Sequence, residues 1–187
     1  METTIATLDQ QLRQTRPAYY ASLQEGLTED AIQALENQYQ RQLPDDLKQL
    51  YKWKNGQADD NYDAFLNNSL FVPLEQALDT AAENISMIGS DFEVANWWHA
   101  GWIPLFHNGG GDYICYDTTG VFTGTTGQLI EFWHADDDRN VIAPSLAALL
   151  EQISQYYATT PPASFDEYFE VNDLPGYPQR FKAEGSL

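Results

Sequence analysis

Cys115 and three histidines carry the most reactive side chains of this chain, but neither their spacing nor their surroundings favour catalysis. A thiol becomes a nucleophile when an imidazole or a cation lowers its pKa. Cys115 lies in an aromatic run between acidic residues, a setting that raises a thiol pKa and is typical of a small buried hydrophobe. His99, His107 and His134 lack the dense spacing of zinc ligands. We therefore expect no catalytic residue and no metal site.

The carboxylates offer a second kind of chemistry. Asp136, Asp137 and Asp138 are consecutive, without the alternate spacing, turn glycine and distal glutamate of an EF-hand, which favours a solvated turn over a calcium site. A pair of carboxylates can hydrolyse glycosides, and tryptophan and tyrosine stack on sugars, but no spacing singles out an acid and a base. A carbohydrate-active or carbohydrate-binding protein stays open as an alternative.

The segment Asn108-Gly-Gly-Gly111 resembles a phosphate-binding loop only superficially. No Gly-Lys-Ser/Thr follows it, and the next run is typical of a strand rather than of a helix whose N-terminus could hold an anion. We therefore expect no nucleotide and no other cofactor.

The charge of the chain is strongly unbalanced. Its 187 residues carry a formal net charge of −19, and no Lys or Arg occurs between Lys54 and Arg139. Such a charge repels phosphate backbones and anionic membranes, so neither nucleic acid nor a membrane is an expected partner. Two interpretations of the acidic middle remain: a solvated surface, or a docking face for a basic protein.

If the acidic face docks a protein, the contacts are expected in its polar loops and at the rim of the central turn. The candidate partner-binding residues are Asp59, Asp60, Asp63, Asp136, Asp137, Asp138, His107, Asn108 and Asp112. A single cysteine, the lack of an N-terminal apolar run and the lack of a stretch of ~20 apolar residues predict a cytoplasmic location.

The stretch from Trp102 to Asp117 predicts the element around which the chain is organised. Two aromatic and apolar runs flank a turn of three glycines, which reach positive φ without steric penalty, as in a β-hairpin. Pro104 cannot donate to a ladder, so we expect it at a bulge or an open edge. The residues assigned to this structural signature are Trp102, Pro104, Gly109, Gly110, Gly111, Tyr113 and Asp117.

The remaining periodicities surround the hairpin with helices and short strands. Helices are expected over 28–43, from Pro44 to a stop at Asn55-Gly56, from Pro73 to Ala81, and from Pro144 onward, with a short helix over 92–98; strands are expected at 70–72, 128–134 and 141–143. We predict an N-terminal helical arm over 1–25, a core domain over 26–158, and a linker and tail over 159–187 that packs on the core.

Several segments together resemble the SUKH superfamily, which includes the fungal Smi/Knr cell-wall assembly regulators. They are Leu43-Pro-Asp-Asp-Leu-Lys-Gln-Leu-Tyr51 ending in Asn55-Gly56, Phe71-Val-Pro-Leu-Glu75, Trp102-Ile-Pro104, Gly110-Gly-Asp-Tyr-Ile-Cys-Tyr-Asp117, Gly127-Gln-Leu-Ile130 and Ala143-Pro-Ser-Leu146. The resemblance spans about Gly26 to Tyr157. It implies an α+β fold with a mostly antiparallel sheet flanked by N-terminal and C-terminal helices.

The resemblance also implies a protein-binding module rather than an enzyme. Many bacterial members resemble immunity proteins, which neutralise a toxin domain, often a nuclease, by binding it. An acidic inhibitor gains fast, steered association with a basic toxin, so the charge agrees with this implication. We expect a non-enzymatic toxin-neutralising protein, with a Smi/Knr-like regulatory scaffold of cell-wall assembly as the alternative.

Overall fold

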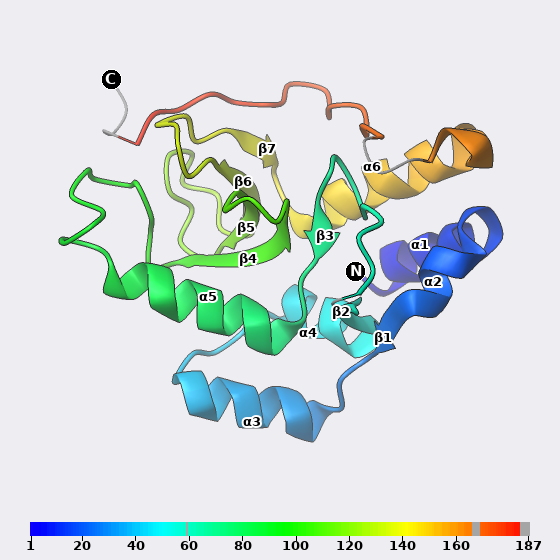
Figure 1. The fold of residues 1–187 in the computed structure, drawn as a ribbon, viewed down its shortest axis with the longest axis horizontal. Coiled ribbons are helices and arrows are strands. Elements are labelled where there is room, and N and C mark those ends of the chain that lie inside the picture. Colours follow the sequence, from blue (N-terminus) through cyan, green and yellow to red (C-terminus); the bar gives the residue numbers. More distant parts are fainter. Residues whose placement is uncertain (59, 166–168, 184–187) are drawn as a thin grey trace.

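The computed structural model describes residues 1–58, 60–165 and 169–183. Its centre is a five-stranded antiparallel sheet in the order β3-β4-β5-β6-β7, and a second sheet pairs β1 with β2 (Figure 1). The strands are β1 (Leu23–Glu25), β2 (Lys54–Gln57), β3 (Leu70–Phe71), β4 (Trp102–His107), β5 (Tyr113–Asp117), β6 (Gln128–Phe132) and β7 (Val141–Ala143). The α+β class with a mostly antiparallel sheet is confirmed.

The expected central hairpin is confirmed as β4 and β5. Trp102 lies opposite Asp117, and His107 lies opposite Tyr113 at the turn end. The register shifts between Pro104 and Phe106, so the proline lies at a bulge, where its missing N–H removes no regular ladder bond.

Helices lie toward both ends of the chain, between β1 and β2, and between β3 and β4. Side-chain caps fix two of their starts: the Thr28 hydroxyl accepts from the Ala31 N–H at 3.2 Å, and Ser145 accepts from Ala148 at 3.2 Å. The helices are α1 (Glu2–Thr15), α2 (Pro17–Ser22), α3 (Glu29–Tyr39), α4 (Asp45–Trp53), α5 (Leu74–Ser86), α6 (Leu146–Thr159) and a 3₁₀ turn, η1 (Pro162–Ser164). None of the helices in the described ranges is long and apolar enough to cross a bilayer.

Alternating strand residues feed two separate apolar clusters. Ile103, Leu129 and their neighbours join the larger cluster, to which α1, α4, α5 and α6 contribute. Trp102, Cys115 and Ile130 belong to a smaller aromatic cluster. Figure 1 shows α5 along the β4 side of the sheet and α6 beside α1. Both faces of the hairpin are therefore buried, which explains its continuous apolar runs.

Two local predictions are wrong. The helix that was expected to stop at Asn55-Gly56 ends at Trp53, and these two residues lie in β2. Gly56 has φ +76°, and a Cβ there would collide with the Pro73 backbone, while the Asn55 side chain accepts from the Leu74 N–H at 2.9 Å. Both residues thus serve the start of α5 rather than a helix end.

The short helix expected over 92–98 is instead irregular. Asn96 has φ +57°, outside the helical region, and the Trp98 ring packs edge-on against Phe132 at 4.9 Å between centroids. Packing of single aromatic side chains on the sheet therefore overrides local helical spacing here.

The tail returns along the sheet. Val141 and Gln179 exchange backbone hydrogen bonds at 2.9 Å, and Asp138 forms a β-bridge with Lys182. Phe169 and Ala183 are buried, and Figure 1 shows the red segment running beside β7. Residues 170–173 of the tail lie near the turn end of β5 and the end of β6.

Candidate functional site

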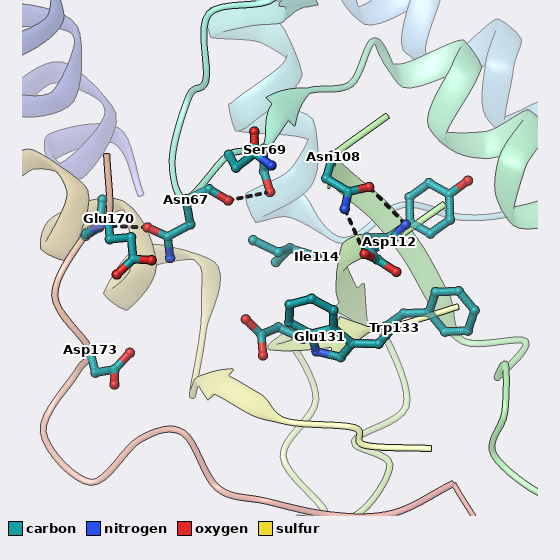
Figure 2. Close-up of a pocket in the computed structure, with 13 residues that line it drawn as sticks. Asn67, Ser69, Asn108, Asp112, Ile114, Glu131, Trp133, Glu170 and Asp173 are labelled. Carbon is teal, nitrogen blue, oxygen red and sulfur yellow. Dashed lines mark hydrogen bonds between the residues drawn. The ribbon is translucent and has the colours of Figure 1, made fainter. Parts of the chain in front are cut away.

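A groove of about 510 Å³ opens where the hairpin turn, the end of β6, the loop before β3 and the returning tail meet. Figure 2 shows its side chains. Four acidic residues line it: Asp112, Glu131, Glu170 and Asp173. No Lys or Arg of the described residues lines it. The wall is completed by Asn67, Asn108 and Trp133, whose side chain is exposed, with a residue exposure of 41%.

The hairpin turn forms one wall through a network around Asp112. The Asn108 amide donates to Asp112 Oδ2 at 2.7 Å, and its Oδ1 accepts from the Gly110 N–H at 2.8 Å. Asp112 Oδ1 accepts from the backbone N–H of His134 at 2.9 Å and contacts its ring Nδ1 at 2.8 Å. The carboxylate thus ties the β4–β5 turn to the residues after β6.

This network also keeps Asp112 charged. Burial raises the pKa of Asp112, but the hydrogen bonds from His134 and Asn108 outweigh burial and leave the pKa below its ordinary value. Asp112 is therefore a fixed negative charge at neutral pH.

Glu131 lies across the groove and is held differently. It pairs with Ile114 in the ladder, and it accepts from the Asn140 amide at 3.0 Å. Burial raises the pKa of Glu131, and the charge of Asp173 adds to this rise. Hydrogen bonds from Asn140 and Trp133 and the positive charge of Arg180 oppose the rise without cancelling it. Figure 2 shows its carboxylate turned toward the side formed by Glu170 and Asp173. A cation in the groove would therefore stabilise the ionised Glu131 carboxylate, whose charge the fold compensates only partly.

The tail is fastened to the opposite loop. The Val171 N–H donates to Asn67 Oδ1 at 2.6 Å, and Asn67 and Asn68 have left-handed φ values of 45° and 53°. This clamp holds Glu170 and Asp173 over the groove. The resulting surface combines anionic groups with the exposed Trp133 ring, which suits a Lys or Arg side chain.

The family model for the SMI1 / KNR4 family (SUKH-1) matches residues 26–152. The chain belongs to the SUKH-1 family. A search of the curated proteins finds no match. The matched range of the SUKH-1 domain contains Asn108, Asp112, Glu131 and Trp133, whereas Glu170 and Asp173 lie after it. One wall of the groove thus comes from residues outside the matched range.

The candidate contacts within the SUKH-1 domain fall into separate places. Asn108 and Asp112 line the groove. His107 lines a different, smaller pocket beside Tyr62, its Nδ1 accepts from the Gly109 N–H at 3.0 Å, and burial lowers its pKa. Asp60 and Asp63 are exposed in the loop after β2, away from the groove, and Asp59 lies outside the described residues.

The triple-aspartate turn is partly compensated by its own chain. Lys182 Nζ lies 2.7 Å from Asp137 Oδ1 and 2.6 Å from Asp138 Oδ1. The fully buried Arg139 donates to the carbonyl oxygens of Asp136 at 2.7 Å and Asp138 at 2.6 Å. The three carboxylates lie within 4.8 Å of one another, but two of them already pair with an ammonium group. This turn does not line the groove.

The hairpin signature serves the structure. Cys115 is fully buried, and burial raises the pKa of its thiol well above the ordinary value, so it is protonated. Asp117 is also fully buried; Oδ1 accepts from the Thr119 N–H and hydroxyl at 2.9 and 2.7 Å, and Oδ2 accepts from Val121 N–H at 2.6 Å and Gln128 Nε2 at 2.8 Å. This carboxylate shapes the connection between β5 and β6.

Sequence reasoning missed Glu131, Trp133, Glu170 and Asp173. For Glu131 a signal existed: it shares strand parity with the core residue Leu129, and an acidic residue in that register requires a polar recess. For the tail residues there was no local signal, because their place depends on the clamp with Asn67.

Proposed function

We propose that this SUKH-1 protein is a non-enzymatic, cytoplasmic immunity protein that binds a basic toxin domain and takes a cationic segment of it into the acidic groove. The observation that carries this proposal is the gathering of Asp112, Glu131, Glu170 and Asp173 around one recess that no Lys or Arg of the described chain lines. The net charge of −19 supports it, because long-range attraction accelerates encounter with a basic partner.

In this mechanism each part of the groove has a role. Asp112 is already ionised and fixed, so it orients a Lys or Arg side chain without reorganisation. Glu131, whose pKa is raised by burial, gains most when the cation arrives. Trp133 covers the aliphatic stem or stacks on a guanidinium. The tail carboxylates, outside the family domain, select the partner.

Binding to the partner would neutralise the toxin by occlusion, without any catalytic step. The direct test is to co-express the protein with any toxin domain that is encoded beside its gene, to measure survival, and to recover the complex in a pull-down with mass spectrometry. The proposal is supported by survival of the cells together with co-purification that weakens as the salt of the pull-down buffer rises from 50 to 500 mM, which shortens the Debye length from roughly 14 to 4 Å. Survival of the cells with co-purification that does not depend on salt contradicts the role of the groove.

The same pull-down distinguishes the alternatives. Recovery of envelope-synthesis proteins instead of a toxin would support the regulatory scaffold of cell-wall assembly. Sugar binding that is lost in an Asp112→Asn variant would support the carbohydrate-binding alternative, because the exposed Trp133 lies in the same groove as this carboxylate.

A further inference from the structure

A second recess, of about 470 Å³, shares no lining residue with the acidic groove. It lies between the end of α3 and the loop that follows it, helix α5, and the segments that precede β4 and follow β5. The recess is thus at the end of the hairpin opposite its turn, and Figure 1 shows that α3 runs below α5. Its apolar floor includes Leu78, Ala82 and Ile85, and its polar residues include Arg41 and His99. The recess is thus amphipathic, with a cation on one side.

Arg41 differs from the other partly buried cations in its contacts. Lys54 also lacks an ion pair among the described residues, but its Nζ lies 4.6 Å from the centroid of the Tyr20 ring. Arg41 is half-buried, yet no ion pair or side-chain hydrogen bond joins it to any residue of the ranges 1–58, 60–165 and 169–183. By contrast, Lys48 pairs with Glu36 at 2.9 Å, and the buried Arg16 and Arg139 donate to carbonyl oxygens. Burial lowers the pKa of the Arg41 guanidinium. A partly desolvated guanidinium without an acceptor favours an anion as its partner.

The backbone fixes the place of Arg41. Gln40 ends α3 in the left-handed region at φ +49°, and the Arg41 N–H donates to the Glu36 carbonyl at 3.0 Å. The arginine is therefore presented by a capped helix end rather than by a free loop, which reduces the entropy lost on binding a ligand.

The other polar groups of the recess are mostly occupied. The Thr118 hydroxyl donates to the Gly101 carbonyl at 2.8 Å, and the Thr119 hydroxyl donates to Asp117 at 2.7 Å. His99 Nδ1 accepts from the Gly101 N–H at 3.0 Å, so the proton of the neutral ring resides on Nε2, which is then a donor. Arg41 and His99 therefore keep donors available to a ligand, and both suit an oxyanion. The side-chain amides of Gln40 and Gln42 also line the recess and make no hydrogen bond within the described ranges.

We propose that this recess binds a carboxylate carried on an apolar body, with the carboxylate on Arg41 and His99 and the apolar body on Leu78, Ala82 and Ile85. The planar guanidinium matches a carboxylate with two parallel hydrogen bonds, which a spherical anion such as chloride does not exploit. Repulsion from carboxylates more than ~8 Å away is screened at physiological salt. The nearer Asp117 carboxylate already accepts four hydrogen bonds, which offset its charge. This site is independent of the acidic groove and of the proposed toxin.

The test uses N-acetyl-L-phenylalanine as the probe and its neutral amide as the matched control. Each is titrated into the full-length protein at 150 mM salt, with amide resonances followed by NMR. The acid is expected to shift the resonances of Arg41, Gly101 and Thr119, and the amide is not. Equal shifts with acid and amide, or no shift with the acid, would overturn the proposal.

Variants identify the residue responsible. Arg41→Gln is expected to weaken binding of the acid at least tenfold, whereas Arg180→Gln, which removes the same charge from an exposed position, leaves it unchanged. Because Arg41 has no partner to lose within the described chain, its variant should melt no lower than the Arg180 variant. Ala82→Trp provides a second route, since Ala82 is exposed and the indole would fill the recess and block binding. Unchanged binding in either site variant refutes the assignment.

The source of the carboxylate is resolved by a second probe, a hexapeptide ending in phenylalanine with a free or an amidated C-terminus. Tighter binding of the free-ended peptide than of N-acetyl-L-phenylalanine supports a protein C-terminus as the ligand. Binding of the small acid alone supports a free apolar acid. Both outcomes require the preference for acid over amide.

Discussion

Replacing Asp117 by Asn should destabilise the protein strongly, although it changes only one oxygen to nitrogen. The buried carboxylate accepts four hydrogen bonds, two at each oxygen. In the Asp117→Asn variant, the amide group of the new side chain must face two of these donors. Turned toward Thr119, it can donate to the rotated hydroxyl but still opposes the Thr119 N–H.

The magnitude follows from this count. The Thr119 N–H loses its acceptor, one hydrogen bond is reversed, and the two that remain lose their ionic character. With about 1.5–3 kcal/mol for a hydrogen bond to a charged group and about half of that for a neutral one, the net loss is about 3 kcal/mol. For a chain of 187 residues this corresponds to a fall in Tm of roughly 6–12 °C.

Thermal unfolding followed by circular dichroism measures this effect. Asp91→Asn is the matched control, because Asp91 is exposed and, within the described ranges, its carboxylate accepts a side-chain hydrogen bond only from the Ser90 hydroxyl at 3.5 Å. The control is expected to melt close to wild type. A Tm for the Asp117 variant within about 2 °C of the control would refute the view that this carboxylate organises the β5–β6 connection.

Three further outcomes follow from the groove and its support. Glu131→Gln should raise Tm at pH 7, because burial raises the pKa of Glu131 and its ionised form therefore destabilises the fold. This gain in Tm should vanish below about pH 4, where the Glu131 carboxyl is protonated in both the folded and the unfolded chain. A gain that does not depend on pH would contradict this explanation. Asp112 has a lowered pKa, so its contribution to the free energy of unfolding is complete above about pH 4 and is lost as the pH falls through that lowered value. In the Asp112→Asn variant, stability measured by fluorescence should therefore fall less steeply with decreasing pH, and an unchanged pH profile would refute this. Arg139→Met leaves four backbone carbonyls without their donor and should lower the free energy of unfolding in urea by about 4 kcal/mol or more. A loss of stability below about 1 kcal/mol would show that water replaces the guanidinium.

The sequence allowed the central hairpin to be predicted because its signals are local. Three glycines, flanking aromatic runs and Pro104 each restrict the backbone within a few residues, and the structure confirms both the turn and the bulge. The stop assigned to Asn55-Gly56 failed because these residues serve a contact with Pro73 and Leu74, which are distant in the chain.

The acidic site could be predicted only in its general character. Charge composition indicated an anionic surface, and Asn108 and Asp112 lie on the groove. The ion pairs of Lys182 with Asp137 and Asp138, and the placement of Asp173 near Glu131, arise when the tail returns along β7. Such contacts between distant segments leave no periodicity or spacing in the sequence.

The most direct measurement of the central claim is the Kd of the complex with the co-purified toxin domain for a groove variant and a charge-matched control. The groove variant is Glu131→Gln/Asp173→Asn, and the control, Glu93→Gln/Asp91→Asn, changes two exposed carboxylates outside the groove. Loss of two charge contacts at about 1.5 kcal/mol each or more predicts an affinity at least ~100-fold weaker for the groove variant, with the control within about threefold of wild type. Equal affinities for the two variants would contradict binding through the acidic groove.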